Sequence, residues 1–77
     1  MPTILKWRGY RFFFFSDEGK EPPHVHVDKA GASVKVWLDP VVVARNAGFS
    51  PTELAEVVRL VQRSQAALLK AWHEFFR

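Results

Sequence analysis

The chain has no cysteine, so it can form neither a disulfide bond nor a thiolate-ligated metal site. It also lacks a long hydrophobic run. Apolar stretches such as Phe12–Phe15 and Val41–Ala44 reach only four residues, whereas a membrane-spanning helix needs about 20 apolar residues. The N-terminal segment MPTILKWRGY has neither the apolar region nor the cleavage site of a signal peptide. We therefore expect a cytoplasmic protein with no membrane partner.

Charge is present with only a small excess of one sign. The 11 Lys and Arg residues against 8 Asp and Glu give a net charge of +3 and a pI near 9.7. A dedicated nucleic-acid-binding domain normally carries a denser basic patch, so this excess favours an acidic partner only weakly. Apolar residues, in contrast, make up 48% of the 77 residues. This is enough for the core of a single domain, 1–77, and surplus apolar surface on a small domain usually meets a partner.

Residues 3–45 predict β-structure. Strands are expected at 3–8 and at 10–16, where the second strand is aromatic on both faces. The polar segment 17–23 contains one glycine and two prolines and must interrupt the sheet. Alternating residues at 24–29 and 34–38 predict a hairpin around Gly31, followed by a short strand at 41–45.

The last third of the chain predicts one long helix, from 51 to 76. Ser50 is a suitable N-cap, Pro51 fits the first helical position, and Glu53 completes an S-x-x-E capping box. At about 100° per residue, one apolar face contains Leu54, Val57, Val58, Val61, Leu68, Leu69, Trp72, Phe75 and Phe76. The predicted fold is α+β: an antiparallel sheet of four to five strands with one long C-terminal helix packed on one face.

Two features of this helix need an explanation. Gln65 lies in the middle of the apolar face and requires a polar partner or a gap in the packing. The helix would be about 39 Å long, whereas strands of five to seven residues extend about 17–23 Å. Trp72, Phe75 and Phe76 would then overhang the sheet. Either the helix lies diagonally or bends near Gln65, or these three residues dock onto a second copy of the chain as a homodimer.

The segment EPPHVHV contains the clearest candidates for a functional site. Strand side chains alternate, so His24, His26 and Asp28 share one face, while Val25 and Val27 take the face that suits the helix. We expect the histidine face to be uncovered and both imidazoles to be accessible. With contributions from the neighbouring strands, the candidate binding residues are Tyr10, Arg11, His24, His26, Asp28, Lys35 and Trp37.

Four interpretations of this face remain open. It is a solvated polar face with satisfied histidines, a surface for a partner protein with aromatic anchors, a platform for single-stranded RNA or DNA, or a metal or catalytic site. On a nucleic-acid platform, bases would stack on Trp37 or on phenylalanine rings, and Lys35 and Arg11 would lie near phosphates.

Catalysis or metal binding would depend on His24 and His26. Acid–base cleavage of RNA needs a histidine or a pair of them, and a cation for the phosphorane. A metal ion could take His24, His26 and Asp28 as ligands, but H-x-H alone is a weak signal and no fourth ligand is identifiable. The sequence therefore predicts no metal site and no cofactor. It also contains no nucleophile elbow and no phosphate-binding glycine loop.

Several ordered motifs make the chain similar to a known family. The motifs GYRFFFFS, EPPHVHV, VWLDPV, GFSPTELAEV and AWHEFF resemble a bacterial family of domains of unknown function, number four-one-six-zero. The resemblance implies a short stand-alone protein, often encoded beside another small domain of unknown function (number two-four-four-two) in a toxin–antitoxin-like pair. It implies no established reaction. The residues that match the motifs are Gly9, Tyr10, Phe12, Glu21, Pro22, Pro23, His24, His26 and Trp37.

We therefore expect a small interaction module that acts by contact with a small protein encoded nearby, with RNA or DNA as a further candidate partner. The alternative belongs to another class: a small, ribonuclease-like RNA-directed enzyme that uses His24 and His26.

Overall fold

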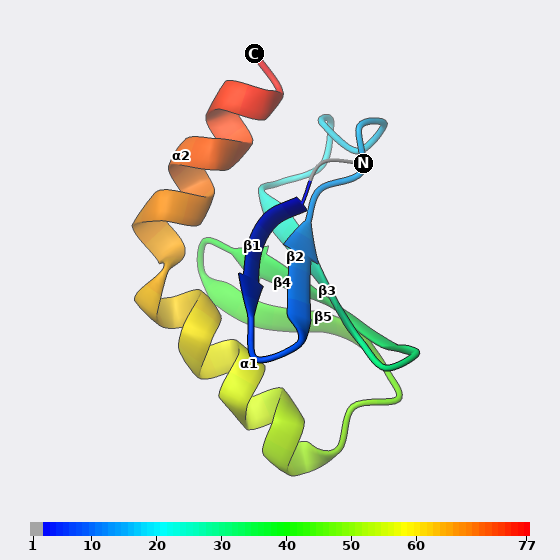
Figure 1. The fold of residues 1–77 in the computed structure, drawn as a ribbon. Helices are drawn as coiled ribbons and strands as arrows, with labels where there is room; N and C mark the ends of the chain where they lie inside the picture. Colours follow the sequence, from blue (N-terminus) through cyan, green and yellow to red (C-terminus); the bar gives the residue numbers. More distant parts are fainter. Residues whose placement is uncertain (1–2) are drawn as a thin grey trace.

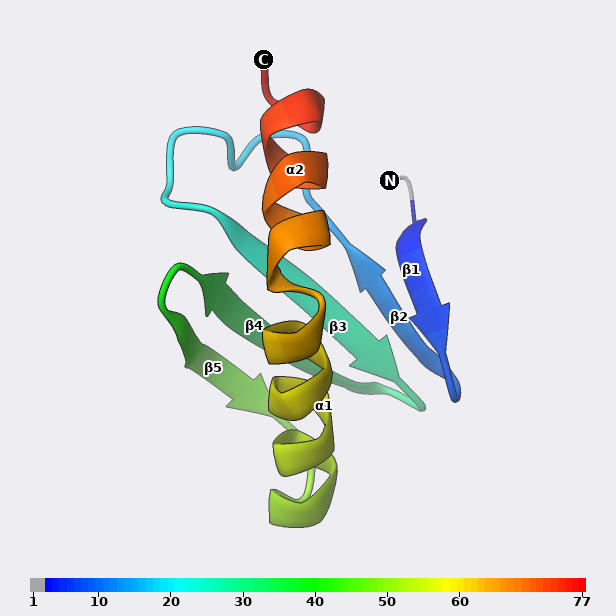
Figure 2. The same ribbon diagram turned by 90° about the vertical axis from the view of Figure 1, so that its left-hand side faces the viewer.

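The computed structural model describes residues 3–77 and arranges them as a sheet covered on one face by two helices (Figures 1 and 2). The strands are β1 (Thr3–Trp7), β2 (Tyr10–Phe13), β3 (His24–Lys29), β4 (Ala32–Leu38) and β5 (Val41–Ala47), and the helices are α1 (Pro51–Arg63) and α2 (Gln65–Phe75). The strands are antiparallel and lie in the order β1-β2-β3-β4-β5.

The α+β class and the antiparallel sheet are confirmed. The prediction of one long helix is wrong, because the helical segment is divided in two.

Two tight hairpins set the register of the sheet. Arg8 and Gly9, with φ of 50° and 84°, join β1 to β2, and Ala30 and Gly31, with the same two values, join β3 to β4. Positive φ at both central residues matches the twist of the flanking strands, and glycine adopts it at the second position without a steric penalty. The hairpin predicted around Gly31 is confirmed.

The core lies between the sheet and the helices. The strands contribute Tyr10, Phe12, Val25, Val27, Val34, Val36 and Leu38, and the rest of the chain contributes Phe14, Phe49, Val57, Val61, Leu68 and Trp72. These residues follow the predicted alternation, so one face of β2, β3 and β4 is apolar and covered. No helix within residues 3–77 is long and apolar enough to cross a membrane.

The division between the helices falls beside Gln65. Its side-chain amide donates a hydrogen bond to the Leu38 carbonyl oxygen, at 2.7 Å, and Ser64 between the helices has φ −100° and ψ 8°. A buried amide without a partner would cost about 1–3 kcal/mol. The chain therefore gives Gln65 the polar partner that its position required, at the end of β4. Of the two arrangements expected for the helix, a bend near Gln65 is the one observed.

The distal end of α2 packs on the segment that follows β2. The ring of the buried Phe14 lies 5.3 Å from that of Trp72, 5.7 Å from Phe75 and 6.2 Å from Phe76. A Cβ atom on Gly19 would lie only 2.5 Å from the Phe76 ring, so glycine permits the loop to approach the helix this closely. Trp72 is 4% exposed. The apolar end of the helix thus has a partner within the chain, and a homodimer through it stays a prediction.

The capping box predicted at the start of α1 is present. Ser50 Oγ accepts a hydrogen bond from the Glu53 backbone N–H at 3.2 Å, and Glu53 Oε1 accepts one from the Ser50 backbone N–H at 3.1 Å. Both bonds satisfy backbone donors that the first turn of a helix leaves unpaired.

Replacing Ser50 by alanine should lower the free energy of unfolding by about 0.5–2 kcal/mol, because the acceptor for the Glu53 N–H is lost. Urea denaturation measures the difference, with Ser50→Thr as a control that keeps the hydroxyl. An unchanged midpoint for Ser50→Ala would show that the cap does not stabilise the helix.

Candidate functional site

The two histidines lie on β3, the central strand of the sheet. His26 pairs with Phe13 of β2 and with Lys35 of β4, and His24 pairs with Trp37 at the end of the sheet. The aromatic rings of Phe13 and Phe15 lie 5.6 Å and 4.5 Å from the imidazole of His26. The alternation of β3 thus brings both histidines, Lys35 and Trp37 together as the sequence predicted.

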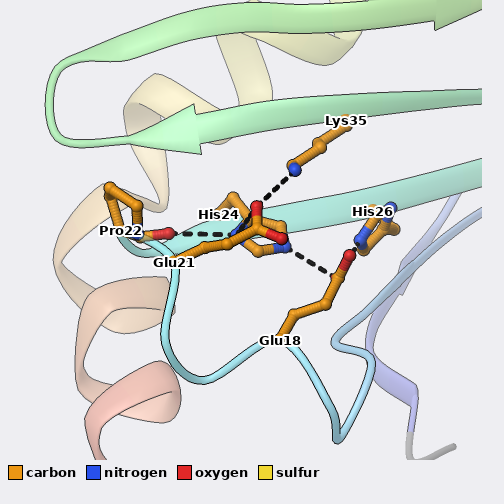
Figure 3. Close-up of polar contacts among 6 residues, drawn as sticks. All are labelled: Glu18, Glu21, Pro22, His24, His26 and Lys35. Atoms are coloured by element: carbon orange, nitrogen blue, oxygen red, sulfur yellow. Dashed lines mark hydrogen bonds and ion pairs between the residues drawn. The ribbon is translucent and has the colours of Figure 1, made fainter.

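The loop between β2 and β3 adds a carboxylate to the pair. Oε1 of Glu18 lies 2.8 Å from Nε2 of His24 and 2.6 Å from Nε2 of His26 (Figure 3). These side chains form the one group of three potential metal ligands found within residues 3–77, and their ligand atoms lie within 4.8 Å of one another. We refer to them as the Glu-His-His cluster.

His24 is not accessible, which corrects the expectation for this face. Its side chain is 0% exposed, against 14% for His26 and 21% for Glu18. Its ring lies 5.5 Å from that of Trp37 and 5.0 Å from that of Trp72, so aromatic groups enclose it. The alternation predicted which side of the strand His24 takes, but not that the loop and α2 would cover it.

The hydrogen bonds of His24 constrain its protonation. Nδ1 lies 3.0 Å from the Pro22 carbonyl oxygen, which can only accept, so Nδ1 carries a hydrogen. Nε2 faces the Glu18 carboxylate, which also accepts when it is ionised. With Glu18 ionised, a positive centre must therefore lie between Nε2 and the carboxylate, either the second hydrogen of an imidazolium or a metal ion.

Burial and the two histidines act in opposite directions on the pKa of Glu18. Burial raises its pKa, but the hydrogen bonds from His24 and His26 lower it by more, so that the pKa lies below its ordinary value of 4.5. Glu18 is therefore ionised at neutral pH, and its side chain is 21% exposed where it lines the site.

Trp72 fixes both ends of the loop that carries Glu18. The Trp72 ring contacts Phe14, where the loop begins, and His24, where it ends. The backbone N–H of Leu38 also donates a hydrogen bond to the Pro23 carbonyl oxygen at 3.0 Å. The loop is therefore held on α2 and on β4, and Glu18 is directed at the histidines.

The cluster borders a pocket of about 330 Å³ on the side of the sheet away from the helices. Its lining residues are Glu18, His26, Lys35, Trp37, Ala44 and Arg45. Lys35 forms an ion pair with Glu21, and its Nζ lies 4.7 Å from the centre of the Trp37 ring. Arg45 is exposed and forms no ion pair with another residue of the described range 3–77. The pocket thus combines an acid–base pair with two cationic groups and an aromatic ring.

The remaining predicted site residues lie apart from the cluster. Asp28 Oδ2 lies 3.5 Å from Arg11 Nη2, so Asp28 is not the third potential ligand that the alternation suggested. Tyr10 faces the helices, where its hydroxyl donates to Glu56 Oε1 at 2.9 Å. Burial and this hydrogen bond raise the pKa of Tyr10 to about 12. Tyr10 therefore belongs to the core and not to the histidine face.

Glu18 and Arg45 are not among the site residues predicted from the sequence, and Glu21 is included there only through a family motif. Both glutamates belong to the polar segment 17–23, for which the sequence predicts no role. One signal could have identified them, because the loop connects two adjacent antiparallel strands. The acidic residues of a loop that joins β2 to β3 must lie near the first residue of β3, which is His24.

The fold and the site define a small α+β domain with a partly buried Glu-His-His cluster beside a pocket that Lys35 and Arg45 also line. Residues 9–73 match the model of a family described as a domain of unknown function, DUF4160, and the chain belongs to this family. The family expected from the sequence motifs is thereby confirmed. Comparisons with curated proteins and with solved structures give no match.

The Glu18 pairing predicts a specific pH dependence of stability. Because the pKa of Glu18 in the folded protein lies below 4.5, its ionised form stabilises the fold above about pH 4.5, and this contribution is lost as the pH falls through the folded pKa. Glu18→Gln should lower the free energy of unfolding by about 1–3 kcal/mol at neutral pH. It should also lose less stability than the wild type on acidification, measured by urea denaturation.

Asp17→Asn is the matched control, because Asp17 is an exposed carboxylate of the same loop. Its loss of stability on acidification should equal that of the wild type. If the free energy of unfolding of Glu18→Gln equals that of the wild type at neutral pH and at acidic pH, Glu18 is not paired with the histidines in solution.

Proposed function

We propose that this protein is a small RNA-directed enzyme that cleaves phosphodiester bonds at the pocket beside the Glu-His-His cluster. The observation that carries the proposal is the lining of this pocket, where His26 and Glu18 lie opposite Lys35, Arg45 and Trp37. Acid–base cleavage of RNA needs a proton acceptor and cations for the phosphorane. Both kinds of group border the same pocket.

His26 would act as the general base. Glu18 accepts a hydrogen bond from its Nε2, which holds the ring in the tautomer that leaves the lone pair of Nδ1 for a substrate proton. The 2′-oxygen of the RNA attacks phosphorus and the P–O5′ bond breaks, giving a 2′,3′-cyclic phosphate and a 5′-hydroxyl. The 2′-hydroxyl proton passes to His26, and the leaving oxygen takes a proton from water.

The cationic groups and the aromatic ring would bind the substrate. Arg45 and Lys35 would neutralise the charge that develops on the phosphorane oxygens, with the phosphate competing with Glu21 for Lys35. The half-buried Trp37 offers a surface on which a base can stack. The mild net charge of +3 is consistent with a short single-stranded substrate rather than a long duplex.

Purified protein should cleave a labelled single-stranded RNA oligomer, but not the DNA oligomer of the same sequence, which lacks the 2′-hydroxyl. His26→Gln should slow cleavage by about 100-fold or more, and Arg45→Ala by about tenfold or more. His73→Gln and Arg63→Ala, at exposed helical positions, are the matched controls and should cleave at the wild-type rate. No cleavage by folded wild-type protein, or equal cleavage by His26→Gln, would contradict the proposal.

A second candidate function is an interaction module that binds a small protein, as expected from the family resemblance. It is supported by a groove of about 470 Å³ that lies apart from the cluster, lined by Val43, Pro51, Leu54, Ala55, Val58, Arg59 and Gln62. The groove lies beside β5, an edge strand with one unpaired side, and Val42 of this strand is 50% exposed. An extended segment of a partner could pair with β5 and place apolar side chains in the groove.

Ala55→Glu should weaken binding of the protein encoded beside this one by about tenfold or more, because it places a charge in the apolar groove. Ala67→Glu introduces the same charge at an exposed position of α2 and should leave binding unchanged. Isothermal titration calorimetry with the purified neighbour measures both. Equal affinities for the two variants would exclude the groove as the contact surface.

A further inference from the structure

We infer that the Glu-His-His cluster binds one divalent transition-metal ion, with the Glu18 carboxylate and the Nε2 atoms of His24 and His26 as its ligands. The inference rests on the geometry of the cluster and not on the proposed RNA cleavage. It departs from the sequence-based prediction of no metal site, in which Asp28 was the third candidate ligand.

The two histidine nitrogens converge on one carboxylate oxygen. A carboxylate has two oxygens, and two separate N–H donors would be less crowded if each used its own oxygen. Instead, both Nε2 atoms approach the same Oε1 of Glu18, at 2.8 and 2.6 Å. Figure 3 shows both imidazoles directed at the end of the Glu18 side chain. A shared point of approach from three side chains is the arrangement of a metal centre.

The backbone also holds His24 in one orientation, through a hydrogen bond to its ring. Metal-binding histidines commonly donate their other ring N–H to a carbonyl or carboxylate, which fixes the tautomer and directs the free lone pair at the ion. His24 does this through Nδ1 and the Pro22 carbonyl oxygen at 3.0 Å. With the hydrogen held at Nδ1, an ion bound between Nε2 and Glu18 would take the place of the hydrogen that otherwise joins these two atoms.

The dimensions of the cluster accommodate an ion after a small movement. Zinc lies about 2.0–2.2 Å from nitrogen and oxygen ligands, so tetrahedral ligand atoms are separated by roughly 3.4 Å. The Glu18–histidine distances are 2.8 and 2.6 Å, so the carboxylate has to withdraw by less than about 1 Å. The three ligand atoms lie within 4.8 Å of one another, so at their widest separation they have to draw together by up to about 1.4 Å. The side chain of Glu18 is 21% exposed and extends from a loop, so a rotation about its side-chain bonds can withdraw the carboxylate.

The ligand set selects the class of ion. Two imidazoles and one carboxylate suit Zn²⁺ and Fe²⁺, whereas a chain without cysteine offers no thiolate for Cu⁺. Three protein ligands leave a coordination position for water, and Glu18 and His26 both line the pocket of about 330 Å³. In the metal-bound form, the role of base assigned to His26 would pass to water held by the ion.

Metal binding can be measured on protein produced without a histidine tag. After removal of metals with a chelator, equilibrium dialysis against Zn²⁺ should give one tightly bound ion per chain. Co²⁺ should produce the intense visible absorption of a four-coordinate site, and Zn²⁺ should displace it. Less than one ion per chain at saturation, or Co²⁺ absorption typical of the hydrated ion, would overturn the inference and leave a shared proton as the positive centre.

Variants test which residues hold the ion. Glu18→Gln and His26→Gln should each weaken Zn²⁺ binding by at least about 100-fold, and circular dichroism verifies that they remain folded. They are preferred to a His24 variant because His24 is fully buried. His73→Gln and Asp28→Asn are the matched controls and should bind Zn²⁺ like the wild type. Retained affinity in both cluster variants, or loss in His73→Gln, would assign the ion to another site.

The outcomes for metal and for RNA are independent. Stoichiometric Zn²⁺ without RNA cleavage would support the metal centre and contradict the proposed function. RNA cleavage by metal-free protein, with no bound Zn²⁺ at saturation, would support the function and contradict the metal centre.

Discussion

The contact of Trp72 with Phe14 and His24 is the interaction on which the rest of the site depends. These two residues mark the beginning and end of the loop that carries Glu18, and they lie 5.3 and 5.0 Å from the same indole ring. The bend at Ser64 and the hydrogen bond of Gln65 to Leu38 determine where α2 lies above them. The packing of Trp72 on the helical side of the sheet therefore positions Glu18 and the histidines, which border the pocket on the other side.

The cluster is polar, but its surroundings are aromatic. Phe13 and Phe15 lie against His26, and Trp37 and Trp72 lie against His24, so the two imidazoles are largely shielded from water. In such surroundings electrostatic interactions are strong, and an unpaired polar atom is costly. The two proposals use the same carboxylate in different ways. In the proposed acid–base catalysis Glu18 accepts a hydrogen bond from His26, and in the proposed metal centre it is a ligand together with both histidines.

The sequence predicted those features that depend on neighbouring residues. Strand alternation, the turn at Gly31 and the capping box at Ser50 are local, and all three are confirmed. The break in the helix was predicted only as one of two arrangements, because the partner of Gln65 lies 27 residues away. The histidine pair was identified, but the burial of His24 and the role of Glu18 were not. Both follow from the path of a loop, which no periodicity describes.

The close approach of Gly19 to Phe76 links the site to the end of α2. The sheet and α1 precede α2 in the chain, and N-terminal parts fold first during synthesis. However, the loop cannot close over His24 until Trp72 and Phe76 have left the ribosome. A growing chain could therefore present a complete sheet while its Glu-His-His cluster is still open to solvent. The Glu-His-His cluster is therefore completed only after the last residues of the helical layer have been synthesised.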